Sequence, residues 1–291
     1  MKKTVFAILL TLPLFVVAQK TDKRLRAKLQ EAASGFNGDI GIYVKNLRTG
    51  KIVAVNADTV FPTASIVKVP ILLGIMDKIQ KGELQYDSSL TYKDSLLYEG
   101  SDILGSFKSG EKILLKKVIM LMLTTSDNTA SLWLQSLAGK GTRINEILDS
   151  LGLKSTRVNS RTPGRENNRT QYGWGQTTPA EMGTIFEKIY RNEIFSAAAC
   201  ERMMRCLGRN YWDENEAVSQ IPPTIEVFSK NGCVNASRSE VLLVNAPHNP
   251  YVFCIFTKNN KDISWTHENE AWTMARKISK ILWEHFEPKG N

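Results

Sequence analysis

A serine and a lysine three residues apart, at the start of an apolar helical run, constrain this chain more than any other feature. The stretch Ser65-Ile66-Val67-Lys68 follows Phe61-Pro62-Thr63-Ala64 and opens an apolar segment that ends at Gly82. Three residues along a helix bring two side chains to one face, so the lysine amine can take the proton of the serine hydroxyl. The first helical turn also directs backbone N–H groups and the positive end of the helix dipole toward a developing oxyanion. The sequence therefore predicts Ser65 as a nucleophile and Lys68 as its base.

Two further motifs follow in order. Ser126-Asp127-Asn128 begins 61 residues after Ser65, and Lys230-Asn231-Gly232 begins 104 residues after Ser126. One S-x-x-K match is weak evidence, because about one or two arise by chance in a chain with this many Ser and Lys, but all three motifs in this order rarely do. Together they resemble the serine penicillin-recognising enzymes, with spacings close to those of class A β-lactamases. The resemblance covers most of the chain and includes Gly50, Phe61-Pro62, Gly82, Thr177-Thr178-Pro179 and Arg238.

The hydrophobic pattern predicts strands at both ends of the chain. Residues 39–45 and 51–56 alternate around Arg48-Thr49-Gly50, which is typical of a β-hairpin. Three more strand-like runs cover residues 224–230, 240–245 and 251–256. Strands from the two ends must therefore meet in one sheet.

The middle of the chain reads as helical. Helices are expected over residues 65–81, 129–137, 142–151 and 269–286, and Thr178-Pro179-Ala180-Glu181 has the pattern of a capping box. With the resemblance, this predicts an α+β fold of two lobes in one domain over residues 19–291. One lobe, about 21–60 and 218–291, holds a five-stranded antiparallel sheet flanked by the terminal helices. The other, about 61–217, is all-helical, and the active site is expected between the two lobes.

The resemblance implies the catalytic roles. Ser65 corresponds to the acylated nucleophile, Lys68 to its activating neighbour, and Ser126 to the proton shuttle to the leaving nitrogen. To accept a proton near neutrality, Lys68 needs a pKa well below the usual value of about 10.4, through desolvation or a nearby cation. Lys230 is the expected source of that positive field, and Asp127 is expected to point inward and brace its loop.

The resemblance also implies a substrate-binding set. Lys230 is expected to face the cleft from an edge strand and attract a substrate carboxylate, where Asn231 replaces the family's usual Thr or Ser hydroxyl with an amide. Gly232 is expected to let substrate approach the strand, and the N–H of Cys233 to serve as the second oxyanion donor. Arg238 either helps bind the carboxylate or forms a structural ion pair. The full set is Asn128, Lys230, Asn231, Gly232, Cys233 and Arg238.

The loop at residues 159–176 departs from the family pattern. Class A β-lactamases carry there a glutamate, followed four residues later by an asparagine, and the two hold the water that hydrolyses the acyl-enzyme. Glu166 is the only acid in this loop, the residue four beyond it is Thr170, and the family's glutamate falls nearer Thr162 when counted from Ser126. Either the loop is rearranged so that Glu166 acts as the catalytic base, or the deacylating base is absent.

The remaining reactive side chains suggest other chemistry only weakly. The four cysteines form no C-x-x-C pair, and ordinary buried thiols are expected, with their pairing left open. The three histidines form no H-x-H or H-E-x-x-H arrangement, and no G-x-S-x-G elbow is present. A zinc hydrolase and a Ser-His-Asp hydrolase are therefore disfavoured, and no metal or cofactor is expected.

Residues 1–18 have the pattern of a secretory signal: Lys2 and Lys3, an apolar run over residues 5–17, and a cleavage site near Ala18. Removing 18 of 291 residues leaves 273, and the loss of two lysines takes the formal charge from +9 to +7. A basic surface suits anionic substrates, while the basic cluster at residues 23–28 reads as the solvated face of a helix and not as a nucleic-acid site. We expect an exported, periplasmic or extracellular monomer without a stable membrane anchor.

These expectations combine into one function. The chain is predicted to be a secreted serine hydrolase that forms an acyl-enzyme with a small-molecule β-lactam or a D-Ala-D-Ala-type peptidoglycan stem peptide, most simply a class A-like β-lactamase. The alternatives are a low-turnover penicillin-binding protein or DD-peptidase, and a catalytically weak module that binds wall peptides.

Overall fold

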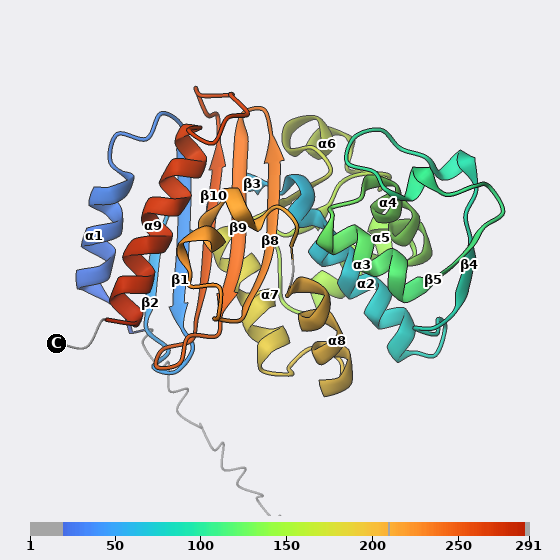
Figure 1. The fold of residues 1–291 in the computed structure, drawn as a ribbon, viewed down its shortest axis with the longest axis horizontal. Coiled ribbons are helices and arrows are strands. Elements are labelled where there is room, and N and C mark those ends of the chain that lie inside the picture. The colour runs from blue at the N-terminus through green and yellow to red at the C-terminus, as the bar shows by residue number, and fades with distance from the viewer. Residues whose placement is uncertain (1–19, 209, 289–291) are drawn as a thin grey trace, which may run out of the picture.

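The computed structural model describes residues 20–208 and 210–288, so the expected signal at residues 1–18 lies outside the described residues. Its main feature is an antiparallel sheet of five strands in the order β2-β1-β10-β9-β8 (Figure 1). The strands come from both ends of the chain, as the hydrophobic pattern predicts. Their bounds are β1 (Asp39–Asn46), β2 (Ile52–Val55), β8 (Val227–Val234), β9 (Ser237–Val244) and β10 (Tyr251–Lys258).

The strand β8 lies at one edge of this sheet and differs from its expected extent. It continues four residues past Lys230, so the whole Lys230-Asn231-Gly232 motif and Cys233 lie within it. A tight turn at Asn235-Ala236 leads directly into β9. Because the first residues of β9 are the polar sequence Ser237-Arg238-Ser239-Glu240, alternation alone does not reveal that they belong to a strand.

The terminal helices α1 (Lys23–Ala33) and α9 (Glu270–Phe286) cover one face of the sheet side by side (Figure 1). Asn269 begins α9 by accepting hydrogen bonds from the N–H groups of Ala271 and Trp272, which is ordinary N-capping. The buried residues of α9 recur every three or four positions and form one stripe against the strands. They are Ala271, Ala275, Ile278, Ser279, Leu282 and Phe286.

The other face of the sheet is covered by α7 (Pro179–Tyr190), beyond which lies the helical part of the molecule. Gly183 of α7 meets the ring of Tyr43, since a Cβ atom at this glycine would lie only 2.5 Å from Tyr43 Cδ1. The remaining helices are α2 (Lys68–Gln80), α3 (Leu115–Thr124), α4 (Asn128–Leu137), α5 (Lys140–Ser150), α6 (Glu166–Tyr172) and α8 (Ala197–Leu207).

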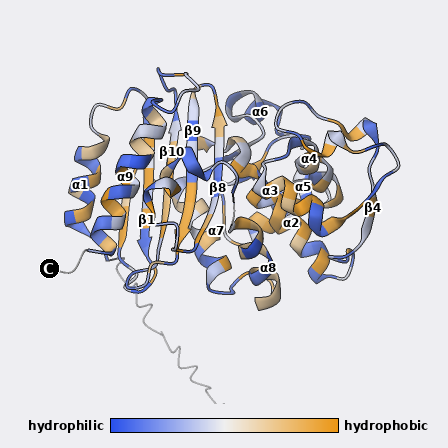
Figure 2. Ribbon diagram, in the orientation of Figure 1, coloured by the Kyte–Doolittle hydropathy of each residue, from blue (hydrophilic) through white to orange (hydrophobic). Residues whose placement is uncertain are grey.

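The helix α2 is the centre of this region. Every residue from Lys68 to Asp77 is buried, and Figure 2 shows the helix as hydrophobic along most of its length. A helix that is apolar all round belongs in a core, so its first turn is held rigidly from several sides. Pro70 is the third residue of α2, where its missing N–H breaks no helical hydrogen bond.

Short elements complete the fold. In one small sheet, β7 (Gly175–Thr177) lies between β3 (Phe61–Pro62) and β6 (Arg157–Val158), and in another β4 (Ser89–Thr91) pairs with β5 (Lys112–Leu114). The 3-10 turns are η1 (Ala64–Val67), η2 (Asp94–Leu96), η3 (Leu104–Ser106), η4 (Asp213–Asn215) and η5 (Ala217–Gln220). None of the helices described here has the length and apolar character needed to span a bilayer. The expected α+β fold is confirmed.

Only one of the two hydrogen bonds of the expected capping box forms. Thr178 Oγ1 accepts a hydrogen bond from the N–H of Glu181 at 3.2 Å, with Pro179 at the first helical position. The Glu181 carboxylate does not return to Thr178. It accepts hydrogen bonds from the N–H groups of Lys154, Ser155 and Thr156, and so fixes the chain just before the loop at residues 159–176.

Candidate active site

Ser65 lies in the 3-10 turn η1. This turn leads directly into α2, whose first residue is Lys68. Sequence periodicity predicts one continuous helix from residue 65, whereas the structure starts with a tighter turn. The turn begins at Ala64, whose φ of 43° is in the left-handed region that L residues with a side chain rarely adopt. Such strain costs on the order of 1–3 kcal/mol and persists only where the surroundings hold it, most often at functional sites.

Lys68 is the hub of the site and has no exposed surface. Its Nζ lies 3.0 Å from Ser65 Oγ and 3.0 Å from Ser126 Oγ. It also lies 2.6 Å from the carbonyl oxygen of Ser126 and 3.0 Å from Asn128 Oδ1. The structure thus brings together four of the residues predicted from the sequence, and both serine hydroxyls reach the same amine.

Burial lowers the pKa of Lys68 well below its usual value, and repulsion from Lys230 lowers it further, while the Asp127 carboxylate opposes both effects. A neutral amine has two N–H donors and one lone pair. The carbonyl oxygen of Ser126 and the amide oxygen of Asn128 can take the two donors. The lone pair is then free for the hydroxyl proton of Ser65, which is the arrangement that general-base activation of a nucleophile requires.

The loop that carries Ser126 is held by a buried carboxylate. Ser126 has a φ of 60°, a second left-handed residue in the site. Asp127 is completely buried and accepts hydrogen bonds from the N–H groups of Ile103, Leu104 and Ala130 at 2.6, 2.9 and 2.7 Å. Asp127 therefore points inward, as expected, and ties the loop to the start of α4.

Gly232 provides the close approach between the sheet and the nucleophile. A Cβ atom at this position would lie 2.3 Å from the carbonyl oxygen of Thr63 and 3.0 Å from the backbone nitrogens of Ser65 and Ile66. Any side chain would therefore push β8 away from η1. The glycine was expected to make room for substrate, but it makes room first for the backbone that presents Ser65.

Lys230 is buried, and the residues that line the cleft do not include it. Its Nζ donates to the carbonyl oxygen and to the Oδ1 of the adjacent Asn231, both at 2.9 Å. Burial lowers the pKa of Lys230 to about 8, and the nearby Glu216 carboxylate limits that fall. Lys230 thus lacks the direct exposure to the cleft that was expected, and its charge reaches the site through its effect on the pKa of Lys68.

Asn231 is fully occupied by other side chains. Its Oδ1 also accepts from Asn210 Nδ2 at 3.2 Å, and its Nδ2 donates to Glu216 Oε1 at 2.8 Å. Cys233 Sγ lies 3.6 Å from the same Glu216 oxygen. The polar groups of β8 that were expected to meet a substrate carboxylate therefore already surround a carboxylate of the protein.

Arg238 has contacts different from those expected of a carboxylate ligand or an ion pair. Its guanidinium donates to carbonyl oxygens of Asn235, Ser237 and Ser264, and lies 4.2 and 5.0 Å from the ring centroids of Trp265 and Trp272. The side chain is almost fully buried. Because Arg238 pairs with Cys233 next to the hairpin turn, its side chain closes that turn and does not line the cleft.

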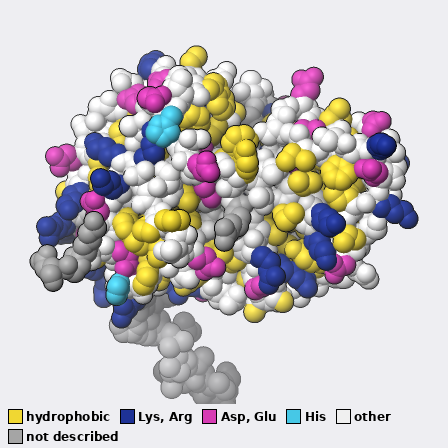
Figure 3. Space-filling view, viewed as in Figure 1, with side chains coloured by type: hydrophobic (Ala, Val, Ile, Leu, Met, Phe, Trp, Pro, Cys, Tyr) yellow, Lys and Arg dark blue, Asp and Glu magenta, His cyan; other side chains and the backbone are white. Residues whose placement is uncertain are grey.

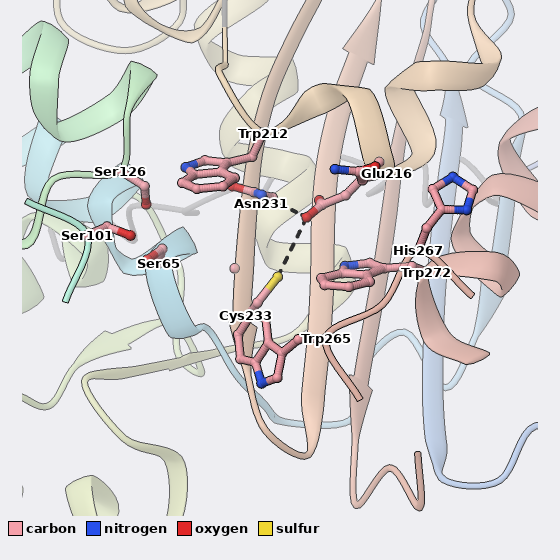
Figure 4. Close-up of a pocket in the computed structure, with 12 residues that line it drawn as sticks. Ser65, Ser101, Ser126, Trp212, Glu216, Asn231, Cys233, Trp265, His267 and Trp272 are labelled. Atoms are coloured by element: carbon pink, nitrogen blue, oxygen red, sulfur yellow. Dashed lines mark hydrogen bonds between the residues drawn. The ribbon is translucent and has the colours of Figure 1, made fainter. Parts of the chain in front are cut away.

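A cleft of about 320 Å³ lies between the sheet and the helical region. In Figure 4 the hydroxyls of Ser65, Ser101 and Ser126 gather on one side, and Trp265 and Trp272 lie on the other. The cleft is lined by Ser65, Ser101, Ser126, Trp212, Asn215, Glu216, Asn231, Gly232, Cys233, Trp265, His267 and Trp272.

The loop at residues 159–176 sends no carboxylate into this cleft. Glu166 is exposed at the start of α6, accepts a hydrogen bond from the N–H of Gly164 at 3.1 Å, and lines a separate hollow together with Thr162. The loop interior instead holds Arg165, which donates to Asn159 Oδ1 and, at 2.8 Å, to Gln176 Oε1. Among the described residues, Glu166 is therefore not brought together with Ser65 and Lys68.

Sequence reasoning did not anticipate Glu216, Trp212 or Trp265 in the cleft. All three belong to segments without regular periodicity, and their arrival at the site depends on how residues 210–220 and 260–269 cross the edge of the sheet. The one local signal for Trp212 and Glu216 is a run of acidic residues after an aromatic residue, Trp212-Asp213-Glu214-Asn215-Glu216.

The four cysteines are all unpaired thiols, and burial raises the pKa of each. Over residues 20–208 and 210–288, no group of three or more His, Cys, Asp and Glu side chains is arranged to hold a metal ion.

Known proteins share this architecture over most of the chain. The beta-lactamase VEB-1 of Pseudomonas aeruginosa is 23% identical over 98% of both chains. The structure of PBP-A superposes with a TM-score of 0.81 at 23% identity, covering 93% of this chain and 98% of that one. A beta-lactamase structure from Chitinophaga pinensis superposes with a TM-score of 0.81 at 19% identity, covering 90% of this chain and 99% of that one. The sequence model of the beta-lactamase enzyme family matches residues 24–286, and the chain belongs to that family.

Proposed function

We propose that this chain is an exported serine hydrolase that opens the amide bond of a β-lactam, or of a D-Ala-D-Ala-type wall peptide, through an ester on Ser65. The observation that carries the proposal is the position of the buried Lys68 amine, 3.0 Å from the hydroxyl oxygens of both Ser65 and Ser126. A base shared by a nucleophile and a second hydroxyl can take a proton on one side of the reaction and return it on the other.

The steps follow from this geometry. Neutral Lys68 takes the hydroxyl proton as Ser65 Oγ attacks the carbonyl carbon, and the N–H groups of Ser65 and Cys233 are assigned to the developing oxyanion. As the C–N bond breaks, Ser126 gives its proton to the leaving nitrogen, and Lys68 replaces the proton on Ser126. The result is an acyl-Ser65 ester and a neutral amine that carries the transferred proton as its N–H, with Lys68 neutral and Ser126 protonated again. Water then releases the acyl group.

Relatives support this choice of substrate. A point mutant of PBP-A was solved as an acyl-enzyme complex with penicillin G, in a fold that covers 93% of this chain. The expected signal at residues 1–18 supports export, which would place the enzyme where wall peptides and β-lactams occur.

Covalent labelling tests the proposal. A fluorescent penicillin should label the purified protein, and Ser65→Ala should remove the label while Ser89→Ala, an exposed serine on β4, keeps it. Circular dichroism spectra of the variants establish that the fold is intact. A label that survives Ser65→Ala would place the nucleophile elsewhere, and no label on any variant would favour the module that only binds wall peptides.

A second candidate is a low-turnover penicillin-binding protein, and one observation favours it: the loop at residues 159–176 directs Glu166 away from the cleft. General-base catalysis of the water step contributes typically 10²–10⁴-fold. The mass of the intact protein over time after mixing with penicillin separates the two candidates, because a hydrolase loses the added mass within seconds to minutes and an acyl trap retains it.

A further inference from the structure

A carboxylate of the protein occupies the part of the cleft where an anionic substrate group was expected. Glu216 is 4% exposed and lines the cleft that contains Ser65. Its Oε1 accepts the hydrogen bond of Asn231 Nδ2 at 2.8 Å and lies 3.6 Å from Cys233 Sγ. Figure 4 shows both contacts converging on the Glu216 carboxylate from the strand β8. The side-chain donors of Asn231 and Cys233 are thus already directed at a carboxyl group of the protein.

The position of Glu216 is fixed from behind. Glu240, on β9 opposite Asn231, is buried and accepts hydrogen bonds from the N–H groups of Ala217 at 2.7 Å and Val218 at 3.4 Å. These two N–H groups begin the turn η5, which immediately follows Glu216. Glu240 is therefore a positioning residue that locks the turn and leaves the Glu216 side chain little freedom to swing out of the cleft.

Among the described residues that line the cleft, Glu216 is the one acid, and none is a Lys or Arg. Behind this lining, two carboxyl groups, Asp213 and Glu240, and two basic groups, Lys230 and Arg238, interact with Glu216. Burial raises the pKa of Asp213 to about 6 and of Glu216 to about 7, because loss of water disfavours the charged form of a carboxyl group. A substrate carboxylate placed beside ionised Glu216 would be repelled, whereas a cation there would be attracted.

Aromatic rings complete the surroundings of Glu216. Trp212 and Trp265 line the same cleft and are 40% and 60% exposed. Arg238 already lies over the Trp265 ring at 4.2 Å, so the rings here accept a cation on their faces. On the face of the molecule seen in Figure 3, acidic side chains lie near the centre, with hydrophobic side chains above and to the right of them and basic and histidine side chains to the left. A carboxylate beside indole rings is a combination that binds ammonium groups.

We propose that Glu216 is a specificity-determining residue that makes the β8 side of the cleft select substrates carrying an ammonium or uncharged group where relatives are offered a carboxylate. The proposal rests on the acylation of Ser65 proposed above and adds the charge of the preferred substrate. It applies to amides and β-lactams whose group next to the leaving nitrogen is cationic or neutral.

The test compares compounds that share one acyl group and differ in the charge of the group next to the leaving nitrogen. Penicillin G carries a carboxylate, its methyl ester is neutral, and its diethylaminoethyl ester is cationic at neutral pH. A neutral alkyl ester of the same size as the cationic ester controls for bulk. The second-order rate constant of acylation is measured for each compound by the mass of the intact protein. In the unmodified protein we expect the cationic ester to react about tenfold faster than its neutral match, and the carboxylate to react slowest.

Two variants assign the preference to one side chain. Glu216→Gln keeps the shape of the side chain but removes the charge, and should bring the rates for the cationic and neutral esters within about twofold of each other. Glu214→Gln removes an exposed charge two residues away and should leave the tenfold preference unchanged. A carboxylate compound that reacts fastest in the unmodified protein, or a cation preference that survives Glu216→Gln, would overturn the proposal.

A binding experiment separates this inference from the proposed function. In Ser65→Ala, which cannot be acylated, quenching of indole fluorescence reports equilibrium binding of the same four compounds. If no compound acylates the unmodified protein, the proposed function fails, yet tighter binding of the cationic ester to Ser65→Ala still supports the role of Glu216. If acylation is efficient but neither rate nor binding depends on charge, the proposed function stands and the inference fails.

Discussion

The first turn of α2 and the loop at residues 159–176 were both expected to supply catalytic groups, and they differ in how the structure uses them. At the first turn, Lys68 is fully buried and reaches two serine hydroxyls. In the loop, Glu166 is exposed, and among the described residues its carboxylate accepts a hydrogen bond only from the N–H of Gly164. The groups that the proposed mechanism assigns to ester formation are brought together, while Glu166, the expected activator of water, is not among them.

In the proposed mechanism, the two half-reactions of an acyl-enzyme depend on separate pieces of chain. The first half depends on a rigid core helix, held by β8 through Gly232 and by the buried Asp127. The second depends on a surface loop, where changes cost little stability. A chain can therefore keep efficient acylation while its deacylation changes, and three measurements test whether that division holds.

The largest effect is expected at Lys68. Lys68→Met keeps an apolar stem but removes the base, so acylation by the fluorescent penicillin should slow by about 10²–10⁴-fold. Lys81 lies just beyond the end of the same helix, and its side chain is 45% exposed, so Lys81→Met should have no effect. A loss of less than about threefold in Lys68→Met would show that another group activates Ser65, and would remove the contrast with the loop.

A smaller effect is expected from Lys230, through the pKa of Lys68. Acylation needs neutral Lys68, so its rate rises with pH and levels off above the Lys68 pKa. Lys230 lowers that pKa by repulsion, so Lys230→Met should raise it and move the rising part of the profile to higher pH. The profile is best measured with a neutral ester, whose own charge does not change. An unmoved profile, or one moved to lower pH, would mean that Lys230 does not set the Lys68 pKa.

The smallest effect is expected in the loop. Because Glu166 lines a hollow apart from the cleft, Glu166→Gln should change the lifetime of the acyl-enzyme by less than about twofold, unlike the loss of a general base. The lifetime follows from the decay of the added mass in the intact protein. An adduct that persists tenfold longer in Glu166→Gln would show that the loop moves and that Glu166 reaches the ester after all.

The sequence predicts most of the fold, because periodic burial is a local signal. The hairpin at Arg48-Thr49-Gly50, the C-terminal helix and the strand β10 all follow from alternation or from a stripe of apolar residues. The pattern misplaces the ends of β8 and β9, where strand residues are polar because they face a buried network. In such a network hydrogen bonding replaces hydrophobic burial, so the usual contrast between inside and outside is lost.

For the site, too, the sequence predicts some residues and not others. The three motifs identify Ser65, Lys68 and Ser126, because residues that meet one amine keep their types and spacing. The orientation of Glu166 depends on contacts of Arg165 with Asn159 and Gln176, which no local pattern encodes. The same holds for Glu216, which reaches the cleft only because Glu240 of a distant strand holds the turn beside it.

The left-handed residues Ala64 and Ser126 have a consequence for engineering and selection. Each stores on the order of 1–3 kcal/mol of backbone strain, in a class of molecule whose whole stability is only about 5–15 kcal/mol. Glycine would relax either position at no steric penalty, so random mutagenesis followed by selection for heat resistance has an easy gain within reach. At Ala64 that gain loosens the turn that presents the Ser65 hydroxyl, and at Ser126 it removes the hydroxyl itself, so thermostable descendants chosen this way would trade catalytic rate for robustness.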